Sequence, residues 1–273
     1  MTLGEALAEA RQKIDRLDAR LLLQYASGCS HADLLARPET PLIAPALAQF
    51  VDWVARRAAG EPLAYLVGEA EFRGRVFLVS PAVLIPRPET EILIDWAVDR
   101  VQGMKTPRIL DLGTGSGIVA ISLALTFPAA EVWAVDVSPA ALQTARSNAG
   151  RLGARVLLVE SDWFAALADQ RFDLIVANPP YIAEGDPHLA GDGLPYEPMM
   201  ALSDGEVGGN GLACIRRIVA DAPGHLNTGG ALLFEHGYDQ GAMSRNLLQQ
   251  AGFKGVLTHP DLAGTDRVSG GHL

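Results

Sequence analysis

The chain has 273 residues, a formal net charge of −10 and two cysteines. This length buries a full hydrophobic core, and the patterns below favour a domain of about 190 residues with a smaller companion. The acidic balance disfavours a nucleic-acid partner, and two isolated cysteines suggest neither a disulfide framework nor a zinc site. Thr2 and Glu5 predict a capped helix and not a signal peptide, and no stretch approaches a membrane span. We therefore expect a cytoplasmic protein without membrane contact.

The first quarter of the chain has the periodicity of helices. Apolar residues spaced for one helical face recur in residues 2–14 and 47–60, and a further helix is predicted from about residue 15 to residue 25. Ser30 and Asp33 have the spacing that begins a short helix. No catalytic constellation occurs in this region. We expect a small helical domain that binds or positions a partner.

A strand, a glycine-rich turn and a helix follow one another near residue 110. Residues 108–112 have a strand pattern, Gly113-Thr114-Gly115-Ser116-Gly117 forms the turn, and residues 118–124 read as a helix. The glycines allow a ligand to approach the backbone, and the start of the helix directs N–H groups toward it. A dinucleotide site would have glycine where this chain has Ile118. The pattern instead resembles that of S-adenosylmethionine-dependent methyltransferases.

The next predicted strand, residues 131–135, ends in an acidic residue. Asp136 follows Asp111 by 25 residues (136 − 111), and a carboxylate at this place can bind both hydroxyls of a ribose. Ser138 and Pro139 have the residue types that begin a helix. The turn and this strand end together predict a site for a nucleoside-type cofactor.

A third predicted strand, residues 155–160, leads to a carboxylate and an indole. Asp162 could accept a hydrogen bond from an adenine amine, and Trp163 could pack on the adenine ring. The other interpretation is that Trp163 and Phe164 are core aromatics at the start of a helix.

The run Asn178-Pro179-Pro180-Tyr181 follows an apolar strand predicted at residues 172–177. Its place is the carboxyl end of the strand, where open α/β sheets bind ligands. The side-chain oxygen of Asn178 and the carbonyl of Pro179 offer two acceptors for a planar NH₂ group, and Tyr181 could cover its flat face. Such a group is a poor nucleophile until both N–H groups are held. The alternative is an ordinary strand exit that two prolines terminate.

Three other segments lie outside these motifs. Residues 72–79 have the alternation of a hairpin, and residues 85–91 hold prolines, an arginine and acids ahead of a helix. The second segment is either a proline linker with Thr90 as a helix cap, or a loop over the amino-acid end of a cofactor. Residues 186–212 read as a long loop, a candidate lid beside Tyr181.

The C-terminal part completes the predicted sheet. Residues 230–235 read as a buried strand, and residues 255–258 with the region around 267–268 could form an antiparallel pair. We expect His236 to pack or to form a hydrogen bond at the end of the sheet rather than to act in catalysis.

Five motifs together resemble one family, the peptide chain release factor glutamine methyltransferases (PrmC, also called HemK). The resemblance covers nearly the whole chain, and residues 85–91 are its most specific motif. It implies an α/β, Rossmann-like methyltransferase fold with a seven-stranded mixed sheet, a small N-terminal helical bundle and a connecting β-hairpin. The implied domains are residues 1–68, 69–90 and 91–273. The motifs are Ile85–Glu91, Asp111–Gly117, Ser161–Phe164, Asn178–Tyr181 and Asp261–Gly264.

The resemblance implies methyl transfer from S-adenosylmethionine to the glutamine amide in the Gly-Gly-Gln loop of bacterial release factors, without a metal and without direct binding of nucleic acid. The product of the cofactor would be S-adenosylhomocysteine. The residues Gly113, Thr114, Gly115, Ser116, Gly117, Asp136, Asp162, Trp163 and Asn178 would bind the cofactor, and the residues Asn178, Pro179, Pro180 and Tyr181 would hold the glutamine amide.

The chain departs from the family pattern at one place, and three other functions are alternatives. Met199 and Met200 stand where many relatives carry Arg-Leu, so a lid contact there is in doubt. A ribosomal-protein glutamine methyltransferase would share the catalytic domain and differ in the front domain. A nucleic-acid amino-methyltransferase would need a basic groove that this acidic chain lacks. A non-catalytic S-adenosylmethionine-binding protein would not need the Asn178–Tyr181 run.

Overall fold

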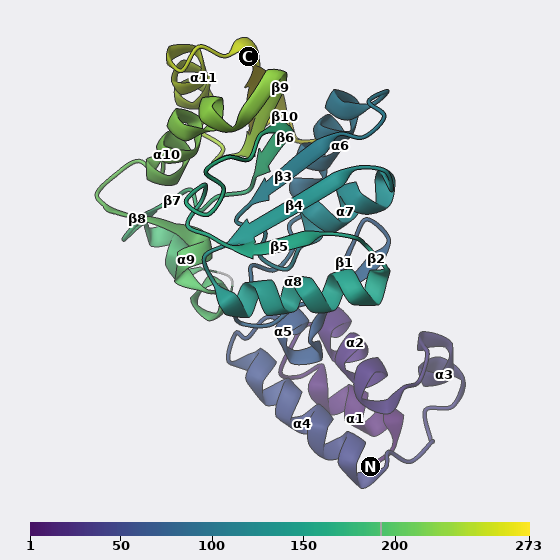
Figure 1. The fold of residues 1–273 in the computed structure, drawn as a ribbon. Helices are drawn as coiled ribbons and strands as arrows, with labels where there is room; N and C mark the ends of the chain where they lie inside the picture. The colour runs from purple at the N-terminus through teal and green to yellow at the C-terminus, as the bar shows by residue number, and fades with distance from the viewer. Residues whose placement is uncertain (192) are drawn as a thin grey trace. The chain divides into compact units, whose positions relative to one another are not determined.

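The computed structural model describes residues 1–191 and 193–273; residue 192, part of the predicted loop 186–212, lies outside the described residues. The chain separates into two compact units (Figure 1). One contains the chain up to Glu69 and a short segment that ends at Tyr196, and the other contains the rest. None of the helices in the described part has the length and apolar composition needed to cross a membrane.

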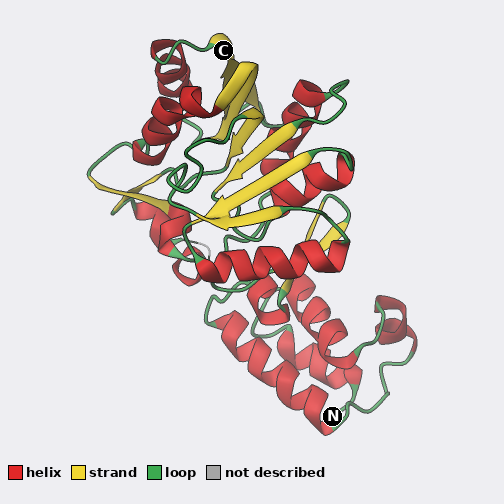
Figure 2. Ribbon diagram, in the orientation of Figure 1, coloured by secondary structure: helices red, strands yellow, loops and turns green. Residues whose placement is uncertain are grey.

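The N-terminal unit is helical (Figure 2). Thr2 caps its first helix in the expected capping box with Glu5, and this helix ends at Ala10, earlier than its apolar pattern. Leu22, Leu23 and Phe50 lie in a buried core that the helices share. The Tyr196 hydroxyl donates a 2.9 Å hydrogen bond to the Ala59 carbonyl within this unit. The helices are α1 (Leu3–Ala10), α2 (Arg16–Ser27), α3 (His31–Ala36), α4 (Ala44–Ala58) and α5 (Leu63–Val67).

The second unit is built on a seven-stranded sheet of order β10-β11-β9-β6-β3-β4-β5. The five strands from β9 to β5 run parallel. At the β9 edge, β11 runs antiparallel to β9, and β10 runs antiparallel to β11. The predicted mixed sheet and its closing antiparallel pair are therefore confirmed. The strands are β3 (Arg108–Leu112), β4 (Glu131–Asp136), β5 (Leu157–Glu160), β6 (Phe172–Ala177), β9 (Leu226–Glu235), β10 (Lys254–Pro260) and β11 (Asp266–His272).

Helices cover both faces of this sheet (Figure 1). Successive strand residues point to opposite faces, so Val176 belongs to one buried core while its neighbours Ile175 and Ala177 belong to the other. Burial on both faces explains why the central strands are apolar without alternation. One face carries α6 (Thr90–Val101), α7 (Ile118–Thr126) and α8 (Pro139–Leu152), and the other carries α10 (Ala213–Asp221) and α11 (Gly241–Gln250).

The segment expected as a long loop contains short regular elements. Strand β7 (Ile182–Glu184) pairs in parallel with β8 (Ser203–Val207), and helix α9 (Met199–Leu202) begins after Pro198. Two 3₁₀ turns, η1 (Pro187–Ala190) and η2 (Leu194–Tyr196), precede that helix. These elements are each of five residues or fewer, too short for their periodicity to be read from the sequence.

The hairpin of β1 (Glu69–Phe72) and β2 (Arg75–Leu78) is held by a buried amide. The side-chain oxygen of Asn148 accepts from the Leu78 N–H at 2.7 Å, and its NH₂ group donates to the Leu78 and Ser116 carbonyls at 3.0 and 2.8 Å. Asn148 is fully buried on α8. It therefore joins the hairpin, the helix and the glycine turn.

The substitution Asn148→Ala should lower the free energy of unfolding by about 2–4 kcal/mol, because it removes three hydrogen bonds and leaves buried backbone groups without a partner. Urea denaturation measures the change. The control is Gln143→Ala, an exposed amide on the same helix, which should change the same free energy by less than about 0.5 kcal/mol. Equal losses in the two variants would contradict this role of Asn148.

Candidate functional site

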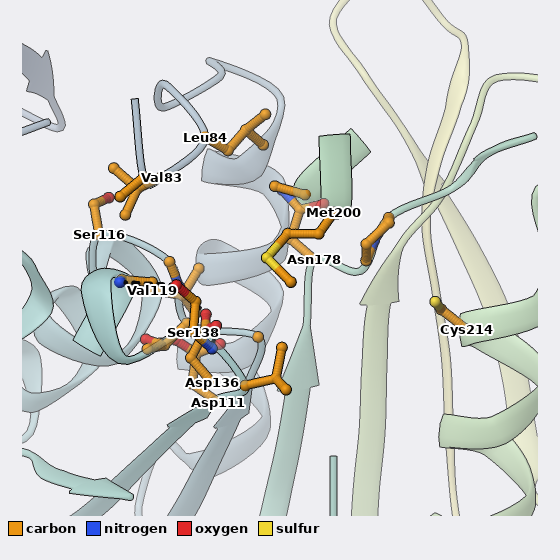
Figure 3. A pocket seen from close by; sticks show the side chains of 18 of the residues that line it. Val83, Leu84, Asp111, Ser116, Val119, Asp136, Ser138, Asn178, Met200 and Cys214 are labelled. Carbon is orange, nitrogen blue, oxygen red and sulfur yellow. Dashed lines mark hydrogen bonds between the residues drawn. The ribbon is translucent and has the colours of Figure 1, made fainter. Parts of the chain in front are cut away.

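A cavity of about 470 Å³ lies at the carboxyl ends of the parallel strands. The chain continues from β3 to β4 on one side and later returns to β6 on the other side of β3, which makes this edge a topological switch point. Figure 3 shows Asp111, Ser116, Asp136 and Asn178 around this cavity. The residues predicted from the sequence that border it are Gly113, Thr114, Gly115, Ser116, Asp136, Asp162, Trp163, Asn178 and Pro180.

The glycine turn has a backbone that side chains would disfavour. Gly115 has φ +56°, and a Cβ atom built on it would have no atom within 4 Å, so the backbone there is open to a ligand. Gly117 has φ +85°, and a Cβ atom would lie 2.8 Å from the Ile121 side chain. Glycine at residue 117 therefore allows the backbone at the start of α7 to pack closely against the Ile121 side chain. Gly117 is not among the described residues that border the cavity.

The buried carboxylate of Asp111 anchors the glycine turn by hydrogen bonds. Its Oδ2 atom accepts from the Thr114 hydroxyl at 2.7 Å and from the Ala120 N–H at 3.1 Å. Burial raises the pKa of this carboxyl to about 6, while the two hydrogen bonds oppose the rise. The sequence motif contains Asp111, but its spacing alone does not indicate this anchoring role.

Asp136 ends β4 and faces the turn. Its Oδ2 atom accepts from the Gly115 N–H and its Oδ1 atom from the Ser138 N–H, both at 2.9 Å. Burial raises the pKa of Asp136 above its ordinary value. Each carboxylate oxygen can accept a further hydrogen bond, so the group can still bind a diol at the cavity.

Trp163 lies against the glycine turn. A Cβ atom on Gly113 would be 3.5 Å from the indole ring, and Trp163 itself has φ +49°, a left-handed conformation that is rare for a large side chain. The Ser161 hydroxyl donates to the Trp163 carbonyl at 2.9 Å and holds this turn. Asp162 accepts from Arg217 at 3.0 Å, and both side chains are more than half exposed.

Asn178 is the first residue after β6, whose last residue Ala177 pairs with both neighbouring strands. Its NH₂ group donates to the Thr90 hydroxyl at 3.2 Å, and the Thr90 hydroxyl donates to Glu235 at 2.8 Å. The Tyr181 hydroxyl also donates to Glu235, at 3.2 Å. Tyr181 and the buried Pro179 are not among the described residues that border the cavity.

Glu235, at the end of β9, is 1% exposed. Burial raises its pKa to about 7, and the hydrogen bonds from Thr90 and Tyr181 oppose that rise. No role for Glu235 was predicted from the sequence. The available signal was its place at the end of a predicted buried strand, because the carboxyl ends of parallel strands meet at one edge of the sheet.

The segment before α6 forms one wall of the cavity. Glu197 is buried, accepts from the Ile85 N–H at 3.0 Å and forms an ion pair with Arg87. Thr90 is the first residue of α6 and bonds Glu235, so it does not cap that helix as the linker interpretation required. The helix begins at Thr90, within the segment 85–91 that was expected to precede it.

Other residues near the site have structural or peripheral places. His236 is buried, with its ring nitrogens 2.8 Å from the Gly237 carbonyl and the Ser269 hydroxyl, as expected for a structural histidine. Met199 and Met200 border the cavity and are more than half exposed.

In the described part of the chain, no group of three or more His, Cys, Asp or Glu residues could hold a metal ion.

Comparisons with known proteins identify the family. A family model described as the PrmC N-terminal domain matches residues 3–68, and one described as a methyltransferase small domain matches residues 90–190. The release factor glutamine methyltransferase of Bordetella pertussis is 51% identical over 95% of this chain and 96% of that protein. The chain belongs to the release factor glutamine methyltransferase family. The proteins of that name from Neisseria gonorrhoeae and Salmonella typhimurium are 48% and 44% identical, over 94% and 99% of this chain and 93% and 97% of theirs.

Solved structures confirm the fold of this release factor glutamine methyltransferase family member. A 16S rRNA methyltransferase of T. thermophilus in complex with AdoMet and guanosine has a TM-score of 0.56 and 22% identity, over 75% of this chain and 49% of that one. A methyltransferase from Pyrococcus furiosus has a TM-score of 0.55 and 19% identity, over 80% of this chain and 95% of that one. The predicted methyltransferase fold is therefore confirmed.

The loop beside Tyr181 offers a test of the site's packing in this family member. A Cβ atom on Gly211 would lie 2.0 Å from the Tyr181 carbonyl oxygen and 2.6 Å from Nε2 of Gln240, which itself donates to that carbonyl. Gly208 has a similar left-handed backbone, φ +67° against +70°, but a Cβ atom there would meet nothing within 4 Å.

We expect Gly211→Ala to lower the free energy of unfolding by at least about 2 kcal/mol more than Gly208→Ala, because only the first change adds a steric clash to the backbone strain. Urea denaturation of both variants gives the difference. Equal destabilisation would show that the close approach of Gly211 to the Tyr181 carbonyl does not exclude a side chain at residue 211.

Proposed function

We propose that this protein transfers a methyl group from S-adenosylmethionine to the side-chain amide nitrogen of the glutamine in the Gly-Gly-Gln motif of bacterial peptide chain release factors. The observation that carries the proposal is that Asn178, at the end of β6, borders the same cavity as the glycine turn and Asp136. Family membership and the names of the relatives support the substrate. Because release factors act in translation, we propose the cytoplasm as the location.

The cavity fits the proposed cofactor. Its volume of about 470 Å³ lies in the range of small-molecule sites, and the open backbone at Gly115 provides a cradle that a Cβ atom would fill. Asp136 would accept from the ribose hydroxyls, Trp163 would pack on the adenine, and Asp162 would accept from the adenine amine. When bound, S-adenosylmethionine supplies a methyl group on a positively charged sulfur.

The residues around Asn178 would prepare the amide nitrogen. The Asn178 side-chain oxygen and the Pro179 carbonyl would each accept one N–H of the glutamine amide, which directs the nitrogen lone pair toward the cofactor side of the cavity. The nitrogen would bond to the methyl carbon as the bond between that carbon and sulfur breaks, which leaves S-adenosylhomocysteine, and the nitrogen would then lose one of its two protons to solvent. The protein contributes positioning, and no residue forms a covalent bond with the substrate. Pro179 and Pro180 lack N–H groups, so the backbone here presents acceptors.

The rival functions have less support. The match of residues 3–68 to the PrmC N-terminal domain favours a release factor over a ribosomal protein as substrate. The net charge of −10 disfavours a nucleic-acid substrate, because binding to phosphates depends on basic residues.

Asn178→Ala should lower the rate of methyl transfer to the release factor at least tenfold, because it removes an acceptor that orients the amide. A tenfold loss corresponds to about 1.4 kcal/mol, which lies within the cost of about 1–3 kcal/mol for a lost buried hydrogen bond. The affinity for S-adenosylmethionine, measured by calorimetry, should remain mostly intact. A variant with near-normal transfer would contradict the role of Asn178.

Asp136→Ala serves as the complementary variant. It should weaken the binding of S-adenosylmethionine at least about tenfold, since the ribose hydroxyls lose a charged acceptor. Unchanged affinity in calorimetry would show that Asp136 does not bind the ribose, whatever the effect on the rate of transfer.

A further inference from the structure

Buried polar groups from two other elements hold the side chain of Asn178. Thr90 at the start of α6 is 0% exposed, and Glu235 at the end of β9 is 1% exposed. Two hydrogen bonds join the three residues, from Nδ2 of Asn178 to Oγ1 of Thr90 at 3.2 Å and from Oγ1 of Thr90 to Oε2 of Glu235 at 2.8 Å. Asn178 is therefore connected to residues 88 and 57 positions away in the sequence (178 − 90 and 235 − 178).

The direction of these hydrogen bonds follows from the number of protons available. An ionised carboxylate only accepts, and a threonine hydroxyl has one proton to donate. Because Thr90 gives this proton to Glu235, its oxygen can only accept from Asn178. Asn178 must then turn its NH₂ group toward Thr90, which leaves its Oδ1 atom as the acceptor available at the cavity.

The groups around Glu235 determine whether its carboxyl is ionised. The hydroxyls of Thr90 and Tyr181 donate to its two oxygens, and the positive charge of Arg267 favours the ionised form. Burial and the nearby charge of Glu89 act against ionisation, and the pKa is raised to about 7. Because a higher pH favours the ionised form, the variants below are compared at about pH 8.

We propose that Thr90 and Glu235 are positioning residues that set the orientation of the Asn178 amide for methyl transfer. The inference rests on the proposed function, in which Oδ1 of Asn178 accepts an N–H of the substrate glutamine. If the Asn178 amide were rotated by half a turn, its NH₂ group would face the NH₂ group of the substrate. Two donors cannot form a hydrogen bond, so the substrate amide would lose one of its two holding contacts.

Thr90→Val tests the proposal, because valine nearly preserves the shape of threonine and removes the hydroxyl. At about pH 8 we expect kcat to fall at least about tenfold, while the affinity for S-adenosylmethionine changes less than about threefold. Thr90→Ser retains the hydroxyl and should keep kcat within about threefold of the unmodified protein. The matched control is Thr126→Val at the far end of α7, whose hydroxyl bonds only the Ser122 carbonyl among the described residues; it should leave kcat unchanged.

A double variant tests whether the effect of Thr90 on kcat passes through Asn178 or is independent of it. If Thr90 acts through Asn178, adding Thr90→Val to Asn178→Ala should lower kcat by less than about threefold beyond Asn178→Ala alone. A further tenfold loss would overturn the inference, as would a normal kcat for Thr90→Val. Should Thr90→Val fail to fold, Thr90→Ala also lacks the hydroxyl and carries the same expectations.

The two proposals fail in different ways. Normal methyl transfer by Asn178→Ala would overturn the proposed role of Asn178 and the inference with it. A slow Asn178→Ala variant together with a normal Thr90→Val variant would overturn the inference alone and leave the proposed function standing.

Discussion

Five parallel strands that end at one edge are the arrangement on which the site depends. Their carboxyl ends bring together groups from distant parts of the sequence, and the return of the chain to β6 beside β3 opens the cavity between them. The helices on both faces keep these strand ends in place, because each strand buries its side chains in two cores. The groups at this edge are the glycine turn, Asp136, Trp163, Asn178 and Glu235.

Buried carboxyl groups at this edge lower stability unless they are paired. Asp111 and Glu235 are both nearly inaccessible, and burial raises the pKa of each. Hydroxyl groups donate to both, which partly offsets the cost of burial. An apolar residue in place of Glu235 would avoid this cost, so its presence beside Asn178 points to the chemistry of the site rather than to stability.

Local patterns predicted much of the fold and part of the site. The glycine turn, the acidic end of β4 and the position of Asn178 after β6 follow from short stretches of sequence, and the structure places them at one cavity. The contact between Thr90 and Glu235 spans 145 residues, and that between Arg87 and Glu197 spans 110, so no local pattern could indicate them. The hydrogen bond from the Tyr181 hydroxyl to Glu235 was likewise not predicted from the sequence, because strand order sets this partner.

The most direct test of the account is the transfer of a labelled methyl group from S-adenosylmethionine to three candidate substrates. These are a purified release factor, the same factor with the glutamine of its Gly-Gly-Gln motif replaced, and duplex DNA. The account predicts label on the intact release factor alone. Label on the altered factor or on DNA, or on none of the three, would contradict it.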